Sequence, residues 1–597
     1  ETRTTFNRGP QRSFECMWRD MGNAVASIAW AVLLLPPITA VFVIISRFSL
    51  LHPIQAVSEC LSFLTSASAI FSFILLCGVI IMVGFLNLEY YTVIPTIACS
   101  KIALLGQLLH PRQFVNSLGH CIMGIIVAWC CAITVGGRYE TIADPCAQGD
   151  GSPQMCLNEY HLILLLAGAF VGFSHSLLGV IYNMNYVSFH TVQQYKYLRF
   201  KGSLSLVLKC SATQALYSVR NYIVVYFFLG KWSLSVHPLD SIAGLLDLSL
   251  LYHLWISASF LLFTWHLTLL LFRVFVTEVY SFPVQSSFTE DAHQCLPTVL
   301  TDKQPMILKF LALLDLALLS QHSPSRRSEV FSLSQPGGHP HNWNAISKEC
   351  LSLLADLTQR LIAYHDTVAT NGRAKSLSTG SERKTSSESS GMFPRPTLLM
   401  KTPASVFARS IVGCPQSPLT APFTPDLDSP FASPALRRLT APMDQCSPWF
   451  GTVQSPHIMR RVPKLWSTST GEKSQALFAD SQAHIWALEG LSYLVQSSFS
   501  EDQFGVVQTA LPSILSCMLG LQEAVDRHFK LPHASSKPVR SASSMGDSTH
   551  KTLRFALRAT LKTSIYRITT TFGNHLNAVK MSAEHRKRLQ QFLEYKE

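Results

Sequence analysis

Ionisable side chains inside long apolar runs are the residues of this sequence most able to do chemistry. Such groups are costly inside a membrane, so they often mark proton relays, transport paths or substrate sites. Asp247, His253 and His266 fall on or near one apolar run. A proton relay or a transporter would pair Asp247 with Lys209 or Arg220. The whole set is His120, His161, His175, Lys209, Arg220, Asp247, His253 and His266.

A structural role for these side chains is the stronger interpretation. His161, Lys209 and Asp247 lie near the ends of their runs, where a polar tip can reach the membrane interface. We also find no inverted repeat between the two halves of the apolar region, a feature of many transporters. A multi-span transporter or a membrane-embedded lipid-handling enzyme remains the alternative function.

Sequence motifs of the common catalytic classes are absent. The chain lacks GxSxG, the P-loop, HExxH, the protein-kinase set and a dinucleotide-binding GxGxxG between a strand and a helix. Its basic segments lack the interleaved aromatic residues and the motifs of nucleic-acid-binding proteins. The 15 cysteines include no CxxC pair. We therefore expect no enzyme, no cofactor, no metal site and no direct contact with nucleic acid.

The elements that must position the titratable groups are membrane spans. The chain has 597 residues and a mean hydropathy of +0.23, and only 14% of its residues are charged, against about 25% in soluble proteins. Residues 1–272 hold only 14 of the 48 Lys and Arg residues. The composition therefore predicts a hydrophobic membrane half followed by a basic, water-soluble half.

Six apolar runs predict membrane-spanning helices. Five runs lack acidic and basic residues over at least the roughly 20 residues that cross a bilayer; the other, 204–229, is interrupted by Lys209 and Arg220. Gly168 and Gly172 in the fourth run indicate a close helix contact. The runs are 21–46, 60–88, 113–137, 160–195, 204–229 and 248–272.

The short loops between these runs indicate the orientation of the chain. With six spans, one side has nine Lys and Arg residues and the other has three, so the basic side is expected to be cytoplasmic. Both termini then lie on the cytoplasmic side. Cys146 and Cys156 lie on the opposite, oxidising side, where they could form a structural disulfide. Two free cysteines are the alternative.

The water-soluble half consists of two helical segments on either side of a linker. Helical spacing of apolar residues is clear in both segments, and Ser, Thr and Pro replace it between them. The sequence therefore predicts an all-α protein with a disordered linker. The expected parts are an N-terminal cytoplasmic segment 1–20, a six-helix transmembrane domain 21–272, a helical segment 273–370, a linker 371–474 and a C-terminal helical domain 475–597.

The linker combines positive charge with candidate phosphorylation sites. It has 13 Lys and Arg residues against six Asp and Glu, and each phosphate would add a charge of about −1.5 to −2. A few phosphates would therefore reverse its sign, although Ser-Pro pairs are common in any disordered tract. The seven sites before proline are Thr402, Ser417, Thr424, Ser429, Ser433, Ser447 and Ser455.

The last helical region is strongly amphipathic. Four basic residues share one face at helical spacing, opposite an apolar stripe at Leu553, Leu557, Leu561 and Ile565. Such a face could lie on anionic lipid or bind an acidic partner, or it could be the solvated side of a bundle helix. The basic residues are Lys551, Arg554, Arg558 and Lys562.

Long stretches of the chain resemble one protein family, the vertebrate nuclear-division-cycle transmembrane nucleoporins. The resemblance covers nearly the whole chain, and runs of this length are specific. One departure is a shorter segment before Gln475. The matching stretches are residues 48–55, 156–161, 193–200, 323–327, 329–343, 484–490, 531–538 and 566–573.

The resemblance implies a structural subunit of the nuclear pore complex. Members of this family have six spans near the N-terminus and a large domain facing the pore side of the nuclear envelope. The resemblance further implies that the chain anchors soluble scaffold nucleoporins to the pore membrane and supports pore assembly and insertion. The partners it implies include the WD-repeat nucleoporin aladin and the small RRM-bearing scaffold nucleoporin.

Overall fold

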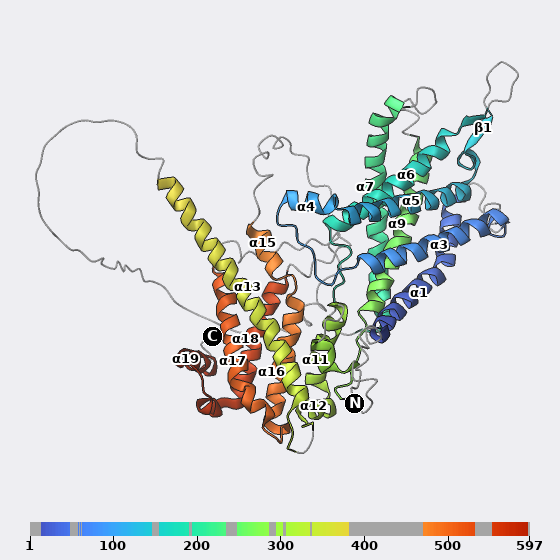
Figure 1. Cartoon of the computed structure of the whole chain (residues 1–597). Helices are drawn as coiled ribbons and strands as arrows, with labels where there is room; N and C mark the ends of the chain where they lie inside the picture. Colours follow the sequence, from blue (N-terminus) through green and yellow to red (C-terminus); the bar gives the residue numbers. More distant parts are fainter. Residues whose placement is uncertain are drawn as a thin grey trace, which may run out of the picture. The chain divides into compact units, whose positions relative to one another are not determined.

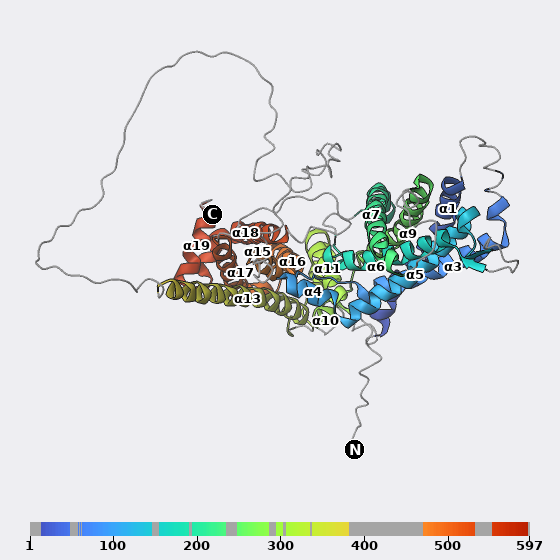
Figure 2. The same cartoon turned by 90° about the horizontal axis from the view of Figure 1, so that it is seen from above.

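The computed structural model is almost entirely helical in the part of the chain that it describes (Figures 1 and 2). Most of the described residues belong to one compact unit, Glu1–His365 with Met459–Glu597. The all-α prediction is confirmed, apart from one small hairpin. The described residues are 14–47, 58, 60, 62–145, 155–189, 194–233, 247–285, 294–301, 306–334, 337–380, 470–531 and 552–594.

Six long helices correspond to the six predicted spans. They pack as neighbours in one bundle, with α5 along α6, α7 along α9 and α1 along α9. Their bounds are α1 Phe14–Arg47, α3 Ala67–Tyr90, α5 Pro111–Val135, α6 Glu159–Ile181, α7 Lys196–Ser233 and α9 Leu248–Val276. A short helix, α4 (Lys101–Leu108), lies between α3 and α5.

Five of these helices are long and apolar enough to cross a membrane, namely α1 from Gly22, α3, α5, α6 and α9. Within the described residues, a sixth span by the same criterion would require α11 (Met306–His322) and α12 (Pro324–Phe331) to form one span despite a bend of 109°. However, α11 is buried inside the helical domain described below. The helix α7 covers the predicted run 204–229 and packs along α9, but it does not meet this criterion, so its crossing of the membrane stays a prediction.

Glycines allow α5 and α6 to cross closely. A Cβ atom at Gly168 would clash with the backbone of Gly124, and one at Gly172 would clash with the carbonyl of His120. The close contact predicted at Gly168 and Gly172 is therefore confirmed. Figure 1 shows α5 and α6 side by side, with β1 near their end. There, β1 (Ala143–Pro145) pairs antiparallel with β2 (Met155–Leu157), after the short helix η1 (Gly137–Tyr139).

The two helical segments of the water-soluble half form a single domain. Helix α11 packs on α16, α16 packs on α18, and α17 and α19 pack on α18. Their apolar faces share one buried core, which includes Leu316, Leu488 and Leu561. The remaining elements are α10 Leu296–Thr301, α13 His341–Gly380, α15 Thr470–Leu477, α16 Ser481–Glu501, α17 Val506–Phe529, α18 Leu553–Phe572, η7 Gly573–Ala578 and α19 Ala583–Leu593.

Helices α13 and α15 both extend into the range predicted as linker, since α13 ends at Gly380 and α15 begins at Thr470. Pro324 begins α12, as expected for proline in the first helical turn. The apolar face of α13 is buried at Ile346, Cys350, Leu354 and Leu357. The predicted linker falls mainly on residues 381–469, which lie outside the described residues, so its disorder stays a prediction.

Candidate membrane interface and junction with the helical domain

The outer surface of the helix bundle is apolar. Large side chains such as Leu33, Ile74 and Phe114 are exposed by 61%, 60% and 63%. An apolar surface spread over several helices of this length would aggregate in water. In a bilayer it is instead covered by lipid chains, while the helices satisfy their own backbone groups. This surface is the candidate membrane interface.

Three histidines from different spans meet inside the bundle. The three are His120 on α5, His175 on α6 and His266 on α9. The ring centroid of His175 lies 5.5 Å from that of His120 and 5.2 Å from that of His266. Ser211 on α7 hydrogen-bonds His266 at 2.8 Å, and Trp265 packs against His120 and His175. Within the described residues, no group of three or more His, Cys, Asp or Glu side chains could hold a metal ion.

Asp247 lies at the end of the bundle, away from that histidine cluster, and its partner is Arg138. The Arg138 Nη2 group donates to Asp247 Oδ2 at 2.6 Å, and this hydrogen bond holds the pKa of Asp247 below its usual value. The structure therefore gives Asp247 a different partner from the Lys209 or Arg220 considered for a transporter. The sequence did contain a sign of this pairing, because Arg138 is the single basic residue of an otherwise acidic loop.

The other titratable groups of the apolar runs also have local partners. His161 Nδ1 lies 2.6 Å from the carbonyl oxygen of Tyr139, and the ring of His253 packs edge-on against the same tyrosine. Arg220 is exposed and hydrogen-bonds Asn221 beside it. These contacts are those of packed helix ends and faces, and they do not form a continuous relay.

Several sequence-predicted sites fall outside the described residues. Cys146 is one of them, and Cys156 is described only through its backbone, which pairs with Asp144. All seven candidate phosphorylation sites lie within residues 381–469. The disulfide and the phosphorylation sites therefore stay predictions.

The four basic residues of the C-terminal region do not form one open surface in the described part. Arg554 is only 3% exposed and lies over the ring of Phe555, and burial lowers its pKa. Arg558 pairs with Asp526 of α17 at 2.7 Å. Lys562 is half-buried, and Lys551 lies outside the described residues. Helical spacing predicted one basic face, but part of this side of α18 packs against neighbouring helices.

The segment after α3 pairs with the segment after α6 through backbone hydrogen bonds. The Thr92 N–H donates to the Asn185 carbonyl at 2.9 Å, and the Val187 N–H donates to the Thr92 carbonyl at 2.9 Å. Val93 and Val187 are buried beside this pairing. The segment that follows α3 is thus joined to the segment that follows α6.

Aromatic side chains join these loops to the helical domain. Phe189, just after the paired segment, stacks on Phe310 of α11 with centroids 5.8 Å apart. The ring of Phe189 also meets Trp486 of α16 edge-on at 5.3 Å. The same buried core contains Phe272 from the end of α9. The membrane bundle and the helical domain therefore share one apolar core at this junction.

An ion pair holds the segment that leaves the last span. Asp315 on α11 and Arg326 on α12 form two hydrogen bonds, of 2.9 and 2.6 Å. Asp315 also accepts from the Phe282 N–H at 2.9 Å, and Arg326 donates to the Phe282 carbonyl at 2.6 Å. We call Asp315, Arg326 and the Phe282 backbone the clamp. Burial raises the pKa of Asp315, although Arg326 opposes the shift.

Sequence reasoning missed the clamp, although one signal was present. Asp315 is the single carboxylate in the apolar helix α11, and a buried charge needs a partner. A second pair follows directly, because Arg327 donates to Glu501 of α16 at 2.9 and 2.6 Å. The two arginines that begin α12 therefore tie it to two different parts of the domain.

Comparisons with known proteins agree with this architecture. The family model for nucleoporin protein Ndc1-Nup matches residues 24–590. The chain is 58% identical to nucleoporin NDC1 of Danio rerio, over 97% of this chain and 98% of that protein. It is 46% identical to the Homo sapiens protein of the same name, over 98% of each chain, and 45% identical to the Xenopus laevis protein, over 97% and 98%.

These relatives agree with the family resemblance found in the sequence, and the match extends through both the helix bundle and the helical domain. The long apolar helices provide the membrane-spanning part that a pore-membrane protein requires. The chain therefore belongs to the Ndc1 family of nucleoporins, as a membrane nucleoporin of the nuclear pore complex in the nuclear envelope.

Proposed function

We propose that this chain anchors soluble scaffold nucleoporins to the pore membrane and supports the assembly and insertion of pores. Its role is structural and not enzymatic. The excess of basic residues on one set of loops supports an orientation with both termini on the pore side. In this orientation the helical domain faces the soluble scaffold.

The clamp is the observation on which this proposal chiefly rests. An anchor must fix the position of its partner-binding domain relative to the membrane. The clamp binds both backbone groups of Phe282, six residues after the end of α9. Together with the aromatic contacts of Phe189, it makes the end of the membrane bundle part of the helical domain's core. A protein whose domain was merely tethered would not need this arrangement.

Partners follow from the family resemblance. We propose that the helical domain binds scaffold nucleoporins, including aladin and the small RRM-bearing nucleoporin. Two exposed aromatic side chains, Phe499 in the last turn of α16 and Phe504 between α16 and α17, give such partners an apolar contact.

Depletion and rescue would test the anchor. Cells depleted of the native protein would receive the wild-type chain or the Asp315→Ala/Arg326→Ala variant. We expect the variant to enter the envelope but to recruit less aladin and less RRM-bearing nucleoporin. Glu523→Gln, which removes an exposed ion pair with Arg527, is the control and should recruit both normally. Full recruitment by the clamp variant would contradict the proposal.

A transporter is the second candidate function, and the histidine cluster is the observation that favours it. Three buried imidazoles in a membrane could relay protons, but Asp247 is paired elsewhere and adds no carboxylate to them. Replacing Asp247, His253 and His266 with apolar residues separates the two functions. An anchor should keep its place at pores and show no associated solute flux. A flux that disappears in the variant would instead favour a transporter.

We propose that the linker sites act as a charge switch. Phosphates on the seven Ser/Thr-Pro sites would reverse the sign of a basic segment and weaken contacts to acidic partners. Replacing all seven with alanine should delay the release of scaffold nucleoporins at mitotic entry. If the release kinetics were unchanged, the seven sites would not act as a charge switch.

A further inference from the structure

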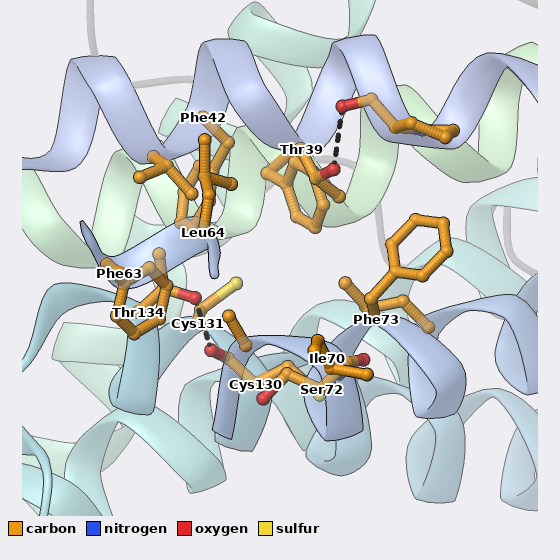
Figure 3. A pocket seen from close by; sticks show the side chains of 15 residues that line it. Thr39, Phe42, Phe63, Leu64, Ile70, Ser72, Phe73, Cys130, Cys131 and Thr134 are labelled. Carbon is orange, nitrogen blue, oxygen red and sulfur yellow. Dashed lines mark hydrogen bonds between the residues drawn. The ribbon is translucent and has the colours of Figure 1, made fainter. Parts of the chain in front are cut away.

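A pocket opens on the side of the membrane bundle (Figure 3). Its volume is about 290 Å³, and it lies between α1, α3, α5 and α9 with the short segment before α3. Figure 3 shows Thr39 and Phe42 on one side and Ile70, Ser72 and Phe73 on the other, with Cys131 between them. The pocket lies near the start of α3 and the end of α5, so it belongs to one half of the membrane.

Small side chains create this space. Ala69, Ser72, Cys130 and Cys131 line it where larger residues would fill it, and Phe42, Phe63, Phe73 and Phe260 surround them. Protein interiors are normally packed as densely as organic crystals. The space is about twice the size of the ~150 Å³ apolar cavity that can bind benzene, so it has room for an apolar group larger than benzene.

The wall of the pocket presents hydrocarbon to its occupant. Thr39 Oγ1 donates to the Leu35 and Pro36 carbonyls of its own helix, and Thr134 Oγ1 donates to the Cys130 carbonyl. These two hydroxyls are thus already used, and none of the described residues that line the pocket has a charged side chain. The Ser72 hydroxyl has no hydrogen-bond partner among the described residues, but neighbouring atoms cover it. Such a wall excludes a polar substrate and favours an apolar one.

Membrane lipid is the apolar molecule that has access to this site. Leu64 and Ile70, which line the pocket, are 37% and 54% exposed on the outer face of the bundle. The pocket is therefore continuous with the surface that lipid chains cover. Its volume, at the lower limit of ligand pockets, fits part of one hydrocarbon chain and not a whole lipid.

We propose that this pocket binds an acyl chain of a membrane glycerolipid. The bound chain completes the packing between α1 and α3, which the protein's own side chains leave open. On the proposed orientation the lipid belongs to the lumenal leaflet. The inference depends on the chain spanning the membrane and not on its partners at the pore.

Photo-crosslinking of the full-length protein would test the site. The protein is placed in phosphatidylcholine vesicles with a trace of phosphatidylcholine that has a diazirine on one acyl chain. Phe260 is the informative residue because it lines the pocket and is only 6% exposed. A chain outside the bundle would label Ile74, which is 60% exposed, but would not reach Phe260. We expect adducts at Phe260 as well as on the outer surface.

Two filling variants and one control make the result specific. The hydroxyl of Ser72 has no hydrogen-bond partner among the described residues, so Ser72→Leu fills the pocket without breaking a hydrogen bond. Ala69→Leu narrows the pocket from a second position on the same helix. Each should reduce the Phe260 adduct about tenfold, which corresponds to a loss of about 1.4 kcal/mol in the free energy of binding the acyl chain. Exposed Ser68, which does not line the pocket, is the control, and Ser68→Leu should leave the adduct unchanged.

Three results would overturn the proposal. The first is labelling of Ile74 without labelling of Phe260 in the wild-type protein. The second is equal labelling of Phe260 in the wild type and in both filling variants, with folding confirmed by unchanged elution of the full-length protein on size exclusion. The third is loss of the Phe260 adduct on adding cholesterol, since the occupant would then be a sterol and not an acyl chain.

Discussion

Asp315 and Arg326 bind each other through two hydrogen bonds and, at the same time, bind the two backbone groups of Phe282. The Asp315 side chain is 2% exposed and the Arg326 side chain 19% exposed. Each charge therefore depends on the other, because a buried charge left without a partner is strongly unfavourable. Both hydrogen bonds to residue 282 are made by its backbone and not by the Phe282 side chain.

Breaking this pair should destabilise the helical domain. Arg326→Met is expected to lower its free energy of unfolding by about 3–5 kcal/mol, the usual range for removing one partner of a buried pair. Hydrogen exchange of the α11 amides in the full-length protein would measure the loss. The exposed pair of Arg527 and Glu523 is the matched control, and Arg527→Met should cost about 0.5 kcal/mol or less.

The Arg326→Met variant should also depend on pH in a definite direction. Burial already raises the pKa of Asp315, and Arg326 opposes that shift, so removing the arginine raises the folded-state pKa further. Between the unfolded and folded pKa values the folded state then binds more protons, and stability falls as pH rises. The variant should therefore regain stability as the pH is lowered from neutral through the raised folded-state pKa of Asp315 toward the ordinary value of 3.8. Adding Asp315→Asn should abolish this recovery, whereas a pH response that persisted would assign it to another group.

The crossing of α5 and α6 should not tolerate a methyl group. Gly168→Ala places a Cβ against the backbone of Gly124 and is expected to cost about 1–3 kcal/mol through overpacking. Gly179, on the same helix, has open space within 4 Å of the point where a Cβ atom would lie, so Gly179→Ala should be neutral. Thermal unfolding in detergent would compare the two. Equal midpoints would mean that the helices can separate without loss.

The orientation of the chain can be tested with protease protection. Tags at Arg12 and after Tyr595 should both be digested on intact nuclear membranes, because the excess of basic residues on one set of loops favours the proposed orientation with both termini on the cytoplasmic side. Cys146 and Cys156 should be protected, and they should react with maleimide only after permeabilisation and reduction if they are bonded. A protected C-terminal tag would instead indicate an odd number of spans.

The basic residues of α18 should divide into two groups. Arg554→Glu should destabilise the bundle, because Arg554 is buried and an unpaired buried carboxylate is costly. Lys562→Glu should leave folding intact while weakening any binding to anionic vesicles by about 1 kcal/mol at low salt. Vesicle sedimentation of the purified full-length protein at two salt concentrations would measure this. Equal binding by wild type and Lys562→Glu would exclude a lipid role for this face.

Local sequence patterns predicted the helices well. Five spans followed from uninterrupted apolar runs, because the thickness of the membrane sets the length of such a run directly. The run 204–229, which corresponds to α7, was a weaker prediction because Lys209 and Arg220 interrupt its apolar pattern. In each case the information lies within a few turns of one helix.

The contacts between distant residues could not be predicted in the same way. The burial of Arg554 and the pairing of Arg558 with Asp526 depend on how α18 faces its neighbours, which helical spacing does not determine. The same holds for Asp247, where two intramembrane cations were considered and a loop arginine 109 residues away is the partner. Sequence spacing identified the charges but not the neighbours that satisfy them.

The pairing of Thr92 with Asn185 and Val187 has a mechanical consequence. A pull on the helical domain would reach α9 through the clamp, and it would also reach α3 and α6 through Phe189 and the paired loops. Tension is thus shared among three spans, and no single helix has to resist extraction from the bilayer alone. A sharply curved membrane could then transmit its stress to the protein scaffold without drawing out one helix.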